Sequence, residues 1–229
     1  MVSLEPYVYF SKVNINDYLN LPKFFQSLLE LNFNNKEGFF GYEELENSYV
    51  IRYFKVINSF ELAFDSTKEK IISEETPKII KGEIRLNCIT ETMIIWGVPK
   101  LIKSINNIFK LPKPFELMDS SLDFKGFYRQ LSQDSSNITE ITFKDIKISN
   151  KYIPLATFAT TNSNDALELI SSIGAQLINT KVELFSSTGE DHIEMDINLK
   201  ESFIKLHYSS ISQIFIEEVK DLVDNLEFI

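Results

Sequence analysis

Two segments near the C-terminus contain both histidines of the chain, together with acids and a lysine. Polar and apolar residues alternate from position 192 to 199, which is typical of a strand with one buried face. A turn at Lys200–Glu201 returns the chain, so residue 207 faces 194 and residue 205 faces 196. We therefore expect one polar face with five chemically active side chains: His192, Glu194, Asp196, Lys205 and His207.

This polar face permits two interpretations. Imidazoles and carboxylates are ligands for zinc and similar ions, so a metal-dependent hydrolase or nuclease is one alternative. The same residues also describe a solvated sheet face with cross-strand charge pairs. We favour the second interpretation and expect no bound metal, no cofactor and no catalytic residue on this face.

Other catalytic patterns are missing from the sequence. The seven glycines never fall in the spacing of a P-loop or a dinucleotide-binding loop. Ser186 to Gly189 is the only suggestive serine cluster, and it is explained as a hairpin turn. Cys88 is expected on the apolar face of a strand, as a core residue rather than a nucleophile.

Four aromatic residues are candidates for an interface. Phe39, Phe40 and Tyr42 lie in a glycine-flanked acidic segment, 37–46, which we interpret as a loop. Trp96 is expected on the face of its strand opposite Ile95. Exposed aromatic residues often anchor protein interfaces, although a loop that folds back would place these rings in the core.

Charge and composition limit the class of partner. The 229 residues have a net charge of −10, and we find no run of Lys or Arg. Nucleic-acid binding is therefore disfavoured, although a local basic patch stays open. One cysteine, no signal-peptide pattern and no apolar run of membrane-spanning length predict a soluble cytoplasmic protein. Heavy use of Ile, Asn, Lys and Phe suggests an AT-rich microbial or viral genome.

The first half of the chain alternates strands and helices. We expect a strand over 7–13, a helix from Asn20 with Pro22 in its first turn, and strands over 49–57 and 60–64 joined by a turn at Asn58–Ser59. Residues 66–77 are expected to form a solvated loop. A hairpin over 81–96, with its turn near Thr90, then leads into a helix from Pro99.

The second half follows a similar order. We expect a helix from Leu122 to Leu131, strands over 141–148, 153–160 and 176–185, and a helix over 163–173. The final hairpin leads into a helix over 212–226 that packs Ile214, Val219, Leu222 and Val223 on the hairpin. The predicted fold is α+β, with a mostly antiparallel sheet and packed helices.

The two halves, about 1–116 and 117–229, suggest an internal repeat. An offset of 111 superposes the two hairpin–helix units, placing Leu86 on Ile197 and Met93 on Ile204. Each half then reads roughly as strand, helix, three or four strands, helix. Few glycines and prolines and no evident linker predict one compact unit over residues 1–229.

These observations favour a non-enzymatic, acidic intracellular binder of a protein partner, such as an accessory, inhibitor or immunity-type protein. The metal-dependent hydrolase on the polar face is the alternative, and a nucleic-acid binder on a saddle-like sheet is a further one. A homo-oligomer is compatible with the sequence.

Overall fold

The computed structural model describes residues 7–33, 36–65, 70–109, 113–118, 123, 126–128, 136–148, 150–208 and 211–224. The chain forms a mostly antiparallel sheet structure with a few helices, as the α+β prediction expected. It divides into two compact units. Unit 1 comprises Met1–Val13 and Leu117–Ile229, and unit 2 comprises Asn14–Glu116.

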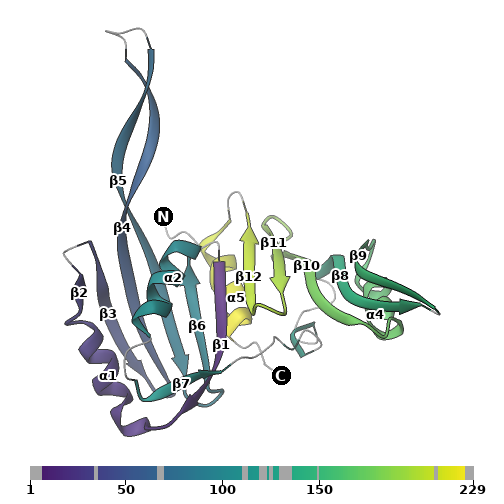
Figure 1. Ribbon diagram of the computed structural model, residues 1–229, viewed down its shortest axis with the longest axis horizontal. Helices are drawn as coiled ribbons and strands as arrows, with labels where there is room; N and C mark the ends of the chain where they lie inside the picture. Colours follow the sequence, from purple (N-terminus) through teal and green to yellow (C-terminus); the bar gives the residue numbers. More distant parts are fainter. Residues whose placement is uncertain are drawn as a thin grey trace. The chain divides into compact units, whose positions relative to one another are not determined.

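Unit 2 is built on antiparallel strands in the order β2-β3-β4-β5-β6. Helices α1 and α2 lie on one side of these strands, and the β4–β5 ribbon extends well beyond its neighbours (Figure 1). The elements are β2 (Asn32–Phe33), β3 (Glu37–Leu45), β4 (Ser48–Asp65), β5 (Lys70–Asn87), β6 (Thr92–Gly97), α1 (Leu21–Leu28) and α2 (Pro99–Ile108), with β7 (Phe115–Met118) crossing the unit boundary.

Both predicted helix starts in unit 2 are confirmed. Asn20 is the N-cap of α1 with a proline in its first turn, and Pro99 opens α2. Proline suits this position because the first-turn N–H has no partner within the helix. Phe25 of α1 stacks on Tyr49 with ring centroids 5.4 Å apart, and Leu101 of α2 packs closely over Gly82. The helices thus bury one face of the sheet.

The long ribbon differs from the prediction. Residues 58–59 do not turn; they continue β4, which pairs with β5 in unbroken register from Ser48↔Asn87 to Asp65↔Lys70. The expected loop over 66–77 is wrong from residue 70 onward, where β5 runs. Ser59 lies opposite Thr76, and their hydroxyl oxygens lie 3.1 Å apart. A cross-strand partner distant in sequence therefore satisfies a residue that would otherwise favour a turn.

Segment 37–46 is also mispredicted, because most of it forms β3 rather than a loop. Gly41 has φ +62°, and the register with β4 shifts between Phe40 and Glu43. Glycine tolerates this positive φ, so Gly41 forms a β-bulge within the strand and does not end it.

Cys88 does not lie in a strand as the sequence analysis expected. Strand β5 ends at Asn87, and Cys88 lies half-buried in the following turn.

Unit 1 is antiparallel in the order β1-β12-β11-β10-β8-β9. Its predicted strands and the helix over 163–173 are confirmed to within a few residues, except that β8 begins at Ser136, well before the expected start at residue 141. The elements are β1 (Tyr7–Ile15), β8 (Ser136–Ile148), β9 (Lys151–Ala159), α4 (Ser163–Ser172), β10 (Gln176–Phe185), β11 (His192–Asn198), β12 (Phe203–His207) and α5 (Gln213–Asp224).

The final hairpin has the predicted register. Met195 lies opposite Leu206, and Ile197 opposite Ile204. Their side chains are buried, whereas the residues between them are half-buried or exposed. The period-two pattern of hydrophobicity therefore decided both the pairing and the buried face.

Helix α5 forms where expected, but the predicted packing face is partly wrong. Val219 and Val223 are buried, Leu222 is only half-buried, and Ile214 is 74% exposed. Phe215 and Ile216 are buried instead. Apolar residues occupy more of this helix than one interface can cover, and burial of the larger phenylalanine removes more apolar area from water than burial of Ile214.

Some expectations lie outside the described residues. Of the helix expected from Leu122 to Leu131, only Phe127 and Tyr128 among its apolar residues are described, and both are buried. The internal repeat is not confirmed and stays a prediction. Within the described part of the chain, no helix is long and apolar enough to span a membrane.

The unit boundaries supply a physical reason for expecting cooperative folding. The boundary after Val13 falls inside β1, and residues 7–9 of β1 pair with Lys205, Ile204 and Phe203 of β12. A fragment of residues 1–116 contains unit 2 but lacks these partners of β1, and it ends inside β7. We expect it to give a poorly dispersed amide NMR spectrum, whereas the full chain unfolds in one transition. A well-dispersed spectrum from the fragment would contradict one-unit folding.

Candidate functional site

The five polar-face residues share one side of the final hairpin, as the sequence predicted. Glu194 lies opposite His207, and Asp196 opposite Lys205. Strand β10 widens this face on the other side of β11, where Glu183 lies opposite Glu194 and Lys181 opposite Asp196. The face thus spans three strands and is backed by the buried residues of β10, β11 and β12.

Opposite charges alternate across part of the polar face. The row through Asp196 places lysines on both neighbouring strands, and Lys181 also lies 3.5 Å from Glu140. Asn179 donates a hydrogen bond of 2.8 Å to Asp196. Such partly exposed pairs typically contribute no more than about 1 kcal/mol each. The row is therefore compatible with a solvated face.

The two histidines occupy different rows of this surface. His192 lies opposite Phe185, with ring centroids 5.9 Å apart and nearly parallel planes. His207 belongs to the row of Glu194 and Glu183. Among the described residues, no group of three or more His, Cys, Asp or Glu side chains is placed to hold a metal ion.

The aromatic candidates do not form one patch. Phe39 is buried against Tyr53, with ring centroids 4.9 Å apart, whereas Phe40 lies half-buried near Phe54. Tyr42 donates a hydrogen bond of 3.0 Å to Glu44; burial and this bond raise its pKa. Trp96 is only 3% exposed. It therefore corresponds to the covered second face of its strand and not to an exposed contact residue.

A polar network fastens the helix-covered side of β4. Lys55 lies 2.7 Å from Glu37 and donates a hydrogen bond of 2.7 Å to Ser104 of α2. Tyr53 donates to Glu37 at 2.8 Å. Although burial opposes ionisation of Glu37, these two donors lower its pKa. This network connects α2 to the strands, so we interpret its charged residues as structural.

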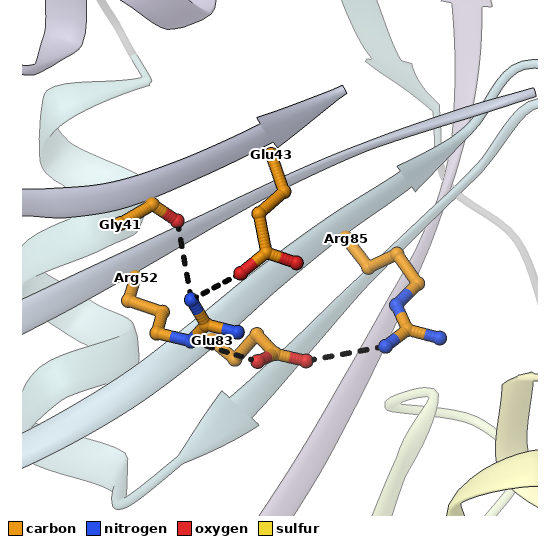
Figure 2. Close-up of polar contacts among 5 residues, drawn as sticks. All are labelled: Gly41, Glu43, Arg52, Glu83 and Arg85. Carbon is orange, nitrogen blue, oxygen red and sulfur yellow. Dashed lines mark hydrogen bonds and ion pairs between the residues drawn. The ribbon is translucent and has the colours of Figure 1, made fainter. Parts of the chain in front are cut away.

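The opposite side of β3, β4 and β5 carries a charged cluster that the sequence analysis did not identify. Figure 2 shows Arg52 between two carboxylates: its Nη1 lies 2.6 Å from Glu43, and its Nε lies 3.3 Å from Glu83. Arg85 also contacts Glu83, at 3.3 Å. Arg52 further donates to the main-chain oxygen of Gly41, and the bond with Glu43 raises its pKa. The cluster is therefore internally charge-balanced.

Beyond this cluster, β4 and β5 continue as a two-stranded ribbon, residues 56–65 and 70–79, which we call the arm (Figure 1). Pairing with β3 ends at Lys55 and the adjoining Val56–Lys36 bond, and β6 pairs with β5 only from Glu83 onward. Among the described residues, the arm thus pairs with itself alone.

The arm exposes large apolar side chains on one side. Phe60 is 72% exposed, Ile71 is 68% exposed and Ile79 is 59% exposed. Phe60 lies opposite Glu75, and the register is unbroken. Because side chains alternate along each strand, all three lie on the side of the ribbon that carries Arg52 where the arm joins the sheet, which we call the base. The β-branched and aromatic residues of 49–57 predicted the first part of β4. The sequence analysis missed the arm because it interpreted Asn58–Ser59 as a turn.

The described residues thus present two candidate surfaces. One is the polar face of unit 1, where opposite charges alternate, and the other is the exposed apolar side of the arm in unit 2. No protein-family model matches this chain, and the comparison with curated proteins found no match.

Proposed function

We propose that this protein is a non-enzymatic binding protein that engages a protein partner through its arm. The observation that carries the proposal is the exposure of Phe60, Ile71 and Ile79 on one side of a two-stranded ribbon. The acidic composition and the absence of recognisable catalytic motifs in the sequence agree with this function.

The arm is an unfavourable structure in isolation. Two-stranded ribbons are at best marginally stable in water, because they lack a third strand or a packed layer to bury apolar residues. A partner that covers Phe60 and its apolar neighbours removes that area from water and supplies the missing layer. Aromatic residues in such positions commonly dominate the energy of an interface.

In this proposal, the charged cluster beside the arm contributes to the recognition of the partner. Because Arg52 and Arg85 are balanced by Glu43 and Glu83, the base offers hydrogen-bonding groups without a strong net charge. Contact with the arm then depends mainly on apolar area, and the polar groups select partners that satisfy them. A protein segment with an apolar centre and a polar rim fits this chemistry.

We expect the double variant Phe60→Ser, Ile79→Ser to lose its partner, because the variant removes the apolar contact area. Wild type and variant are immobilised and exposed to the same lysate of the native host, and captured proteins are quantified by mass spectrometry. Proteins that bind through the arm should decrease by about tenfold or more, the equivalent of 1.4 kcal/mol.

Ile89→Ser is the matched control, because Ile89 is also 71% exposed but lies in the turn between β5 and β6. It should capture the same proteins as wild type. Hydrogen exchange of the arm amides should slow when the captured partner is added. Equal capture by the double variant and by wild type would refute binding through the arm.

A further inference from the structure

Strand β9 is an open edge in unit 1. It ends the strand order, and its pairing among the described residues is with β8 on one side. Every side chain of this nine-residue strand is exposed or half-buried. Tyr152 is 59% exposed and Leu155 is 56% exposed. Such an apolar edge is a template for pairing with another strand.

Each outward-facing residue of β9 has a backbone N–H group that can donate to another strand. Thr160 donates its N–H to the carbonyl of Thr139, so position 160 faces β8. Because groups alternate along an antiparallel ladder, even positions of β9 face β8 and odd positions face outward. Pro154 occupies an even position, so its backbone nitrogen, which carries no hydrogen, faces β8 and not the open edge. The outer N–H groups of Ile153, Leu155 and Thr157 are uninterrupted.

Edge strands of soluble proteins are usually protected by charged residues, by an outward-facing proline or by a bulge. In β9, the sequence KYIPLATFA contains one charge, Lys151, although the chain carries 23 basic and 33 acidic residues. The proline faces inward, and the register with β8 shows no shift. Within the described residues of unit 1, this edge therefore lacks the usual protection.

We propose that β9 pairs antiparallel with β9 of a second copy of this chain, about a two-fold axis at Leu155. Leu155 is the middle residue of the strand, so this register overlaps the strand along its whole length. Outward-facing positions meet each other, as the hydrogen-bond pattern requires. A two-fold pairing uses the same surface twice and closes after two copies.

The side chains suit this self-pairing. Leu155 meets its own equivalent, Tyr152 meets Phe158, and Lys151 meets Ala159, so no like charges lie opposite each other. The pairing also covers the most exposed apolar residues of the strand. This inference concerns a different surface from the arm, so arm variants should remain dimeric.

Charge substitutions at the axis test the proposal, because residue 155 would face itself. Leu155→Lys and Leu155→Asp each place two like charges opposite one another, and each should weaken the dimer by about tenfold or more. An equimolar mixture of the two variants pairs lysine with aspartate and should restore a heterodimer. Sedimentation velocity of the full chain measures all three, and Ile214→Lys, at an exposed site on α5, should stay dimeric.

A second measurement uses the unmodified protein. Hydrogen exchange at the outer amides of Ile153, Leu155 and Thr157 should slow as concentration rises, whereas Gly189 in a hairpin turn should not change. A monomeric wild type at all concentrations, with unchanged exchange along β9, would overturn the proposal. Retention of the wild-type dimer by both charge variants would overturn it as well.

Discussion

Gly82→Ala is expected to reduce the free energy of unfolding by about 3 kcal/mol, at the upper end of the usual cost of overpacking. A Cβ atom at this position would lie 2.5 Å from the main-chain oxygen of Trp96 and 2.6 Å from Cδ2 of Leu101. Such contacts are too close, and one neighbour is backbone in the adjoining strand. The substitution must therefore separate β5 from β6, and the side chain of Leu101 must shift as well.

Urea denaturation followed by circular dichroism measures this loss, and Gly174→Ala is the matched control. A Cβ at Gly174 has no neighbour within 4 Å, so its substitution should change the free energy of unfolding by less than about 0.5 kcal/mol. If the two variants had equal midpoints, Leu101 and its helix would be able to move away at little cost, and the tight packing of α2 over β5 would be contradicted.

The second large effect is expected in α5. Phe215→Ala should cost about 3–5 kcal/mol, because the ring is only 4% exposed and its removal leaves a cavity. Ile214→Ala, at the neighbouring position with a side chain 74% exposed, should cost less than about 0.5 kcal/mol. The pair compares adjacent positions on one helix, so a difference in helix propensity cannot explain a gap of this size.

Thermal and urea unfolding of both variants tests the orientation of α5. Hydrogen bonds at the start of the helix support the observed orientation: Ser212 donates its N–H to Asp191 at 3.1 Å, and its hydroxyl accepts the N–H of Phe215 at 3.3 Å. A larger loss for Ile214→Ala than for Phe215→Ala would contradict this orientation and favour the packing face expected from the sequence.

The proposed arm and the β9 edge make separate claims about association. Variants at Phe60 and Ile79 address a different protein partner, and variants at Leu155 address a second copy of the chain. Each set leaves the other surface unchanged, since the arm belongs to unit 2 and β9 to unit 1. The failure of one proposal therefore does not affect the other.

Short-range patterns in the sequence determined much of the fold. The alternation in β11 and β12 predicted the register, the buried face and the five residues of the polar face. The hairpin of β5 and β6, with its turn near Thr90, was predicted for the same reason, and in the structure Leu86 lies opposite Met93. In both hairpins the partners are close in sequence, so the turn and the apolar pattern restrict the register to one choice.

Tertiary structure decided the features that depend on distant partners. Whether Asn58–Ser59 turns or extends depends on Thr76 and Pro77 across the ribbon. Whether α5 buries Ile214 or Phe215 depends on the surface against which it packs, because apolar residues cover several sides of that helix. Hydrophobic pattern and turn propensity are local properties, whereas exposure of the arm and of β9 depends on which strands find neighbours. The sequence by itself therefore determined the polar face, and only the tertiary structure decided where apolar surface remains exposed.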